Sequence, residues 1–279
     1  MGERIEKLKF FCYTDKRKRA RQANMLLFSK RSLFYATSRF QSRAAGDTLF
    51  ISDFFAMMDF TNIDFLGIDR VLRRGTGTVL SGGDAPLIRD SISGAYLLAS
   101  RDASLSLPLL DKCAGEISLL MVPDAALGQL VYERYGFSGK LECFQVAYYG
   151  ELPKEEPALS VRVARREDLP LLLAHYHLIS PQELELAVER GSILIGSLGN
   201  QVVGFIGEHL EGSMGLLYVF PAFRRKGFGA ALESLYIRKT MEAGFVPFGQ
   251  VEKDNLPSLE LQKKLGMTIS ENLIFWMWK

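Results

Sequence analysis

The feature that most constrains the fold is a basic, glycine-containing loop between an apolar strand and a helix. Residues 216–232 run Leu-Leu-Tyr-Val-Phe-Pro-Ala-Phe-Arg-Arg-Lys-Gly-Phe-Gly-Ala-Ala-Leu. The first amides of a helix have no partner within it and lie at the positive end of its dipole, so anions bind there. Gly227 and Gly229 carry no side chain that would keep phosphate oxygens from those amides. Positive charge comes from the preceding residues Arg224, Arg225 and Lys226. The segment predicts a diphosphate site.

A second segment, residues 251–267, has a related design. A short apolar strand is followed by Asn255-Leu256-Pro257-Ser258 and then by a helical pattern that ends before Gly266. Together the two segments resemble the acyl-CoA signature of the GNAT N-acetyltransferase superfamily: Arg224-x-x-Gly227-x-Gly229 after a Val-x-Pro strand end, then the strand, asparagine and helix. The resemblance covers residues 159–279 and is closest to the branch that includes glycine N-acyltransferase-like proteins.

The resemblance implies an α+β fold, in which a mostly antiparallel, splayed sheet is flanked by helices. It implies acetyl-CoA as co-substrate and no metal. The backbone of Tyr218 and Val219 would pair with the pantetheine arm, and Asn255 and Ser258 would lie near the pantetheine or the acyl end. The pyrophosphate would bind the amides of Lys226, Gly227, Phe228, Gly229 and Ala230, with Arg224 and Arg225 beside it.

Two departures from the family concern catalysis. Many members carry a glutamate base early in the strand before the loop, where this chain has Ser213. Many also use a tyrosine in the last helix as general acid, where this chain has Gln262. A base is useful because an amine with a pKa of about 10.4 is almost fully protonated at neutral pH. Glu211 ranks first as a substitute because it neighbours the vacant position and Glu208 ranks second, with His209 also within reach. Exposed hairpin charges are the alternative.

Hydrophobic periodicity predicts a mixture of helices and strands. Up to about Phe40 the pattern is helical, and a hairpin is expected after Gly75. Expected helices are 63–74, 125–135, 166–177, 181–189, 227–243 and 256–265, with Ser180 and Gly136 as caps. Expected strands are 95–99, 117–122, 141–149, 159–163, 193–197, 202–209, 214–220, 247–251 and 273–278.

The N-terminal half contains a degenerate copy of one part of the C-terminal half. Residues 121–137 parallel residues 251–267. No paired glycines occur near residues 100–104, so we expect this half not to bind CoA, and instead to shape the acceptor pocket or complete the sheet. Chance similarity is the alternative. A polar stretch with two prolines, residues 150–157, predicts two domains, 1–150 and 158–279.

Composition excludes few functions. A net charge of +2 does not argue for a nucleic-acid or membrane partner, although residues 16–21 are strongly basic. Cys12, Cys113 and Cys143 have no metal-like spacing, and no run approaches the ~18 apolar residues of a membrane helix. Cytoplasm is the expected compartment. The oligomeric state, a monomeric pseudo-dimer or a homodimer, stays open.

The sequence therefore predicts an N-acetyltransferase that moves the acetyl group of acetyl-CoA to a primary amine by direct attack. The acceptor is a small amine, an amino acid or a protein amine. An acyl-CoA-binding sensor or scaffold without activity is the alternative, and nucleic-acid binding through residues 16–21 is a third hypothesis.

Overall fold

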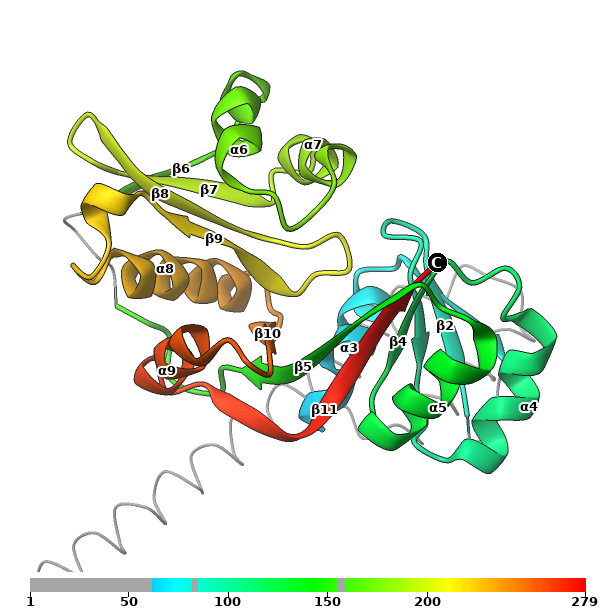
Figure 1. Ribbon diagram of the computed structural model, residues 1–279. Helices are drawn as coiled ribbons and strands as arrows, with labels where there is room; N and C mark the ends of the chain where they lie inside the picture. The colour runs from blue at the N-terminus through cyan, green and yellow to red at the C-terminus, as the bar shows by residue number, and fades with distance from the viewer. Residues whose placement is uncertain (1–61, 82–84, 155–158) are drawn as a thin grey trace, which may run out of the picture.

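The computed structural model describes residues 62–81, 85–154 and 159–279. The helical pattern predicted before Phe40, the basic run 16–21 and Cys12 lie outside these residues. One sheet of 11 strands runs through the described chain in the order β1-β2-β3-β4-β11-β5-β10-β9-β8-β7-β6 (Figure 1). Only β3 with β4 and β9 with β10 pair in parallel. The predicted α+β fold with a mostly antiparallel sheet is confirmed.

After the elements that open each half, the two halves have the same order of strands and α-helices. The N-terminal half consists of η1 (Ile63–Phe65), α3 (Leu66–Arg73), β1 (Gly77–Ser81), β2 (Leu87–Asp90), β3 (Tyr96–Leu98), α4 (Ala103–Cys113), β4 (Leu119–Val122), α5 (Ala125–Tyr135) and β5 (Gly139–Ala147). The C-terminal half begins with β6 (Ser160–Val163), η2 (Arg166–Asp168) and α6 (Leu169–His175). From its second helix onward it follows the order that the N-terminal half shows from α3. These elements are α7 (Pro181–Glu189), β7 (Ile193–Leu198), β8 (Gln201–Glu208), β9 (Met214–Val219), η3 (Pro221–Phe223), α8 (Phe228–Glu242), β10 (Phe248–Glu252), α9 (Leu256–Lys264) and β11 (Thr268–Trp278).

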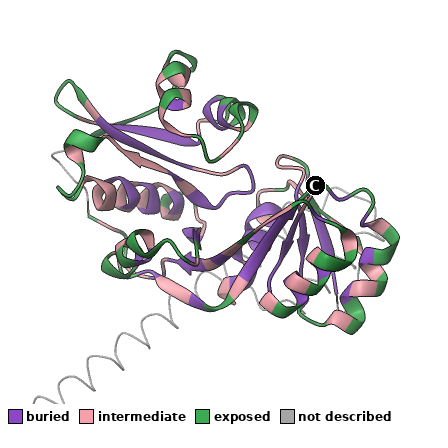
Figure 2. Ribbon diagram, in the orientation of Figure 1, coloured by how far each residue is buried: buried purple, intermediate pink, exposed green. Residues whose placement is uncertain are grey.

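The helices of the C-terminal half lie on opposite faces of the sheet (Figure 1). On one face, Leu172 of α6 and Leu184 of α7 pack with Phe205 of β8. On the other face, α8 and α9 cover apolar side chains of the same strands, such as Ile206 and Met214. This arrangement leaves the loop before α8 at the edge of the layer, and its residues are mostly exposed (Figure 2).

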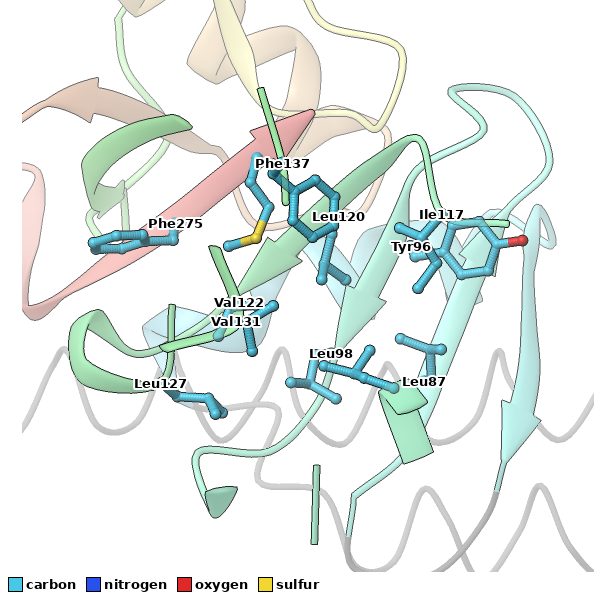
Figure 3. Packing of buried hydrophobic residues seen from close by; sticks show 12 residues of the cluster. Leu87, Tyr96, Leu98, Ile117, Leu120, Val122, Leu127, Val131, Phe137 and Phe275 are labelled. Atoms are coloured by element: carbon cyan, nitrogen blue, oxygen red, sulfur yellow. The ribbon is translucent and has the colours of Figure 1, made fainter. Parts of the chain in front are cut away.

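The last strand of each half pairs with a strand of the other half. β5, from the N-terminal half, pairs antiparallel with β10 over residues 143–147, and β11, the last strand of the chain, pairs antiparallel with β4 over residues 119–122. β5 and β11 also pair with each other at the centre of the sheet. Phe275 and Met277 of β11 consequently pack in a core whose other buried residues, among them Leu127 and Val131 of α5, come from the N-terminal half (Figure 3).

Candidate functional site

The loop before α8 has the geometry of an anion site. Gly227 precedes the helix with φ 88° and no side chain caps the helix start. Arg225, two residues earlier, also has a positive φ of 62°. A Cβ built on Gly227 would face open space. No side chain therefore occupies the first amides of this 15-residue helix, which is a geometry that suits an anion.

The basic side chains lie around this helix start. Arg224, Arg225 and Lys226 are all exposed. The Arg224 Nε donates a hydrogen bond of 2.9 Å to the carbonyl of Val219, and its guanidinium lies 5.4 Å from the ring centre of Tyr218. Lys226 Nζ donates to the carbonyl of Ala222 at 2.9 Å. Two of the three cations are thus folded against the loop, where they raise the local positive potential.

The sheet splits where β9 meets β10. The two strands pair at a single point, Met214 with Gly249. Towards the loop β9 has a bulge: between the pairs Phe205–Tyr218 and Gly207–Gly215 it contains one residue more than β8, and Leu216 has a positive φ of 49°. Beyond Met214 no described strand pairs with this edge of β9. A ligand with hydrogen-bonding amides can therefore lie along Tyr218 and Val219, although the carbonyl of Val219 already accepts from Arg224.

A partly open cavity of about 380 Å³, including its mouth, lies at the split on the side of α8 and α9. Both separating strands line it, with Met214, Gly215, Leu217, Gly249, Gln250 and Val251. Ser258 of α9, predicted near the pantetheine, lines the cavity as well. Asn255 does not line it: its side chain accepts from the amide of Ser258 at 3.2 Å and caps α9. The structure thus brings Ser258 to the split and gives Asn255 a capping contact.

The two candidate bases differ in their surroundings. Glu208 forms an ion pair of 3.1 Å with Arg70 of α3, and both side chains are largely buried. The guanidinium of Arg70 also lies 4.5 Å from the ring centre of Phe245. Because a buried charge that loses its partner is costly, this contact holds Glu208 in a structural role. The second-ranked candidate is therefore less available than the sequence suggests.

Glu211 is buried in the turn between β8 and β9, where its carboxylate accepts a hydrogen bond from the Ser213 hydroxyl. The turn thus brings a carboxylate to the serine at the position where a base is expected. His209, in the same turn, has Nδ1 3.4 Å from Glu183 Oε1, and its ring lies against Gly215. Burial alone would lower the pKa of His209, but the carboxylates of Glu183, Glu211 and Glu208 together raise it above its usual value.

One functional candidate was not predicted from the sequence. Glu233 of α8 is 5 % exposed and lines the cavity at the split together with Gln262 of α9. Burial raises the pKa of Glu233 to about 7, although a hydrogen bond from Gln262 acts in the other direction. The available signal is its position among Leu232, Tyr236 and Ile237, a glutamate within the buried face of a helix.

Within residues 62–81, 85–154 and 159–279, no cluster of three or more His, Cys, Asp or Glu side chains is arranged to hold a metal. No helix of the described chain is long and apolar enough to span a membrane.

Comparison with known proteins agrees with this geometry. Residues 159–267 match the model of the acetyltransferase (GNAT) family. No curated protein matches the chain. Among solved structures, a Drosophila protein that was a structural genomics target is 15 % identical, with a TM-score of 0.55 over 90 % of this chain and 95 % of that one.

Two further solved structures are similar to this chain. A GCN5-related N-acetyltransferase from Kribbella flavida is 12 % identical, with a TM-score of 0.48 over 78 % of this chain and 94 % of that one. A tandem GNAT protein from the clavulanic acid biosynthesis pathway is 12 % identical, with a TM-score of 0.44 over 76 % and 86 %. The similarity to the Drosophila protein supports the fold across both halves. The match to the acetyltransferase (GNAT) family model is confined to residues 159–267.

Proposed function

We propose that this protein transfers the acetyl group of acetyl-CoA to a primary amine. The family match supports acyl transfer in general, and the choice of acetyl-CoA and of an amine acceptor is our inference. The observation that carries it is the combination of two features that involve β9 and α8: an uncapped helix start with three basic residues, and a cavity where β9 and β10 separate. The first suits a diphosphate, and the second suits the pantetheine arm and its thioester.

In this proposal the amides of residues 226–230 bind the pyrophosphate, and the β9 edge at Tyr218 and Val219 guides the arm toward Ser258. The amine approaches from the face covered by α6 and α7. Its nitrogen attacks the thioester carbonyl directly, and a backbone amide of β9 stabilises the oxyanion. Glu211 accepts the proton that the nitrogen loses, with Glu208 as the second candidate. No acyl-enzyme intermediate is required.

The N-terminal half has a different role in the proposal. The start of α4, the counterpart of α8, is capped by the Asp102 side chain, which accepts from the amide of Ser104 at 2.8 Å. A carboxylate at this place competes with a phosphate. We therefore infer that the N-terminal half is a degenerate second copy that binds no CoA, and that it supports the acceptor side within a monomeric pseudo-dimer. A cytoplasmic location is part of the same proposal.

The function is tested by a CoA-dependent thermal shift together with thiol release from acetyl-CoA across a panel of small amines, amino acids and peptides. We expect both a shift and turnover with at least one amine. A shift without turnover across the panel would contradict the transferase and favour an acyl-CoA-binding sensor. No shift with CoA would contradict both functions.

The base is tested by E211Q and E208Q, with E185Q on the exposed face of α7 as the matched control. We expect E211Q to lower kcat by about 10²-fold or more, because the amine then lacks its proton acceptor. E208Q should mainly lower the melting temperature, because it leaves Arg70 without its carboxylate, and E185Q should change neither. Native turnover in E211Q would exclude Glu211 as the base.

A further inference from the structure

The cavity at the split contains two buried polar atoms that no described residue satisfies. Oε2 of Glu233 and Oε1 of Gln262 have no hydrogen-bond partner, and both side chains are 4–5 % exposed. Leaving a buried polar atom unpaired costs about 1–3 kcal/mol. Two such atoms side by side in one cavity indicate that a polar group of a ligand belongs there.

The remaining walls of this cavity are neutral. Apart from Glu233, its lining residues on β5, β8, β9, β10 and α9 carry no titratable side chain. The side-chain amide of Gln262 donates a hydrogen bond to the Glu233 carboxyl. With no cation beside it, burial holds the pKa of Glu233 at about 7. A large fraction of Glu233 is therefore a neutral acid near pH 7, which is the form that donates a proton.

The position of the cavity connects this acid to the reaction. Both strands that separate at the split line it, and α8, which carries Glu233, also supplies the predicted diphosphate site. An arm that starts at the first turn of α8 and follows β9 therefore reaches this cavity with its sulfur end. We propose that Glu233 is the general acid of the transfer and donates its proton to the sulfur of CoA. This inference rests on the proposed function.

The step balances in protons and electrons. The amine nitrogen forms the C–N bond, the C–S bond breaks, and the electron pair of that bond remains on sulfur, which takes the proton of Glu233. The nitrogen loses its proton to Glu211. Exchange with solvent then reprotonates Glu233 and deprotonates Glu211, so that the products are the amide and free CoA thiol. Gln262 acts as a positioning residue, because its amide holds one carboxyl oxygen and leaves Oε2 without a partner.

The kinetic test compares E233Q with E242Q, a control on the exposed part of the same helix. We expect E233Q to lower kcat by about 10²-fold, with KM for acetyl-CoA unchanged and the fold intact by thermal melting. The native kcat should fall at alkaline pH, where Glu233 ionises, and E233Q should lack this fall. Q262L should move the fall to higher pH, because the Gln262 amide lowers the pKa of Glu233. A native kcat and pH profile in E233Q would overturn the proposal.

A second measurement does not depend on turnover. The Glu233 carboxyl is titrated by carbon-13 NMR, assigned with E233Q, in the presence of CoA and of desulfo-CoA. We expect the two pKa values to differ, because only CoA brings a sulfur to the carboxyl, and equal values would overturn the proposal. A sulfur-dependent difference without transfer to any amine would overturn the proposed function and the acid role together, and would leave Glu233 as a binding group for the thiol.

Discussion

At the scale of single residues, the raised pKa of Glu233 makes the stability of the folded protein depend on pH. Its pKa is raised from 4.5 to about 7 in the folded protein by burial. The folded state therefore holds the proton more tightly than the unfolded state. Below pH 4.5 both states are protonated and the folded state has no disadvantage. As the pH rises toward 7, the unfolded state ionises first and the folded state loses stability.

The E233Q protein without ligand should therefore gain stability over the native protein as the pH rises. Relative to pH 4.5, we expect a gain of about 3 kcal/mol at pH 8, from a pKa difference worth about 1.4 kcal/mol per unit. Urea unfolding of both proteins at pH 4.5, 6 and 8 measures the difference. A pH-independent difference would show that Glu233 does not titrate abnormally.

At the scale of elements, helices whose ends are set by residues close in sequence could be predicted from the sequence. α5 and α7 have the predicted bounds, because Gly136 adopts the left-handed conformation after one and Ser180 caps the start of the other. β11 is longer than predicted. It begins at Thr268, where it pairs with Ala147 of the other half, and the pairing shifts between Ile269 and Leu273. A partner so distant in sequence leaves no local pattern.

In the candidate site, too, the parts formed by neighbouring residues could be predicted, and the contacts between distant residues could not. The loop before α8 could be predicted because glycines and cations adjacent in sequence form it. The pairing of Glu208 with Arg70, 138 residues away, and the contact of Glu233 with Gln262 could not. These contacts depend on which helix faces which strand, and periodicity alone does not specify that.

The glycine at the start of α8 gives a prediction at this scale. G227A and the control G199A both place alanine at a positive φ, 88° and 56°, where the added Cβ meets no neighbour. Each should cost about 1–2 kcal/mol of stability. Only G227A places its methyl at the predicted phosphate site, so only G227A should weaken CoA binding, by about tenfold, or about 1.4 kcal/mol. Calorimetric titration with CoA checks this, and equal affinities of the two variants would contradict the anion site.

At the scale of the whole molecule, the halves are joined by more than the shared sheet. Arg70 of α3 pairs with Glu208, and Arg74 donates both to the carbonyl of Leu210 at 2.6 Å and to Asp90 at 2.9 Å. The turn with the candidate bases is thus held by a helix of the N-terminal half. The sheet exchange adds apolar contacts, because Ile274 of β11 packs with N-terminal side chains and Val146 of β5 packs under α8 and α9.

We expect that neither half folds alone. Residues 1–154 and 155–279, expressed separately, should each lack a cooperative unfolding transition, because β4 and β10 each lose a neighbouring strand. Mixed or coexpressed, they should reassemble and recover the thermal shift with CoA. Circular dichroism melts of each half and of the mixture test this, and a cooperative transition in either half alone would contradict it.

The strand exchange also determines at which point of synthesis each half can complete its part of the sheet. A chain leaves the ribosome from its N-terminus, and domains usually fold in that order. Here β4 pairs with β11 (Thr268–Trp278), which is synthesised after every other strand of the described chain. The N-terminal half therefore completes its sheet only after β11 has left the ribosome. A chain that stopped before Thr268 would leave both halves, and not only the second, without a central strand.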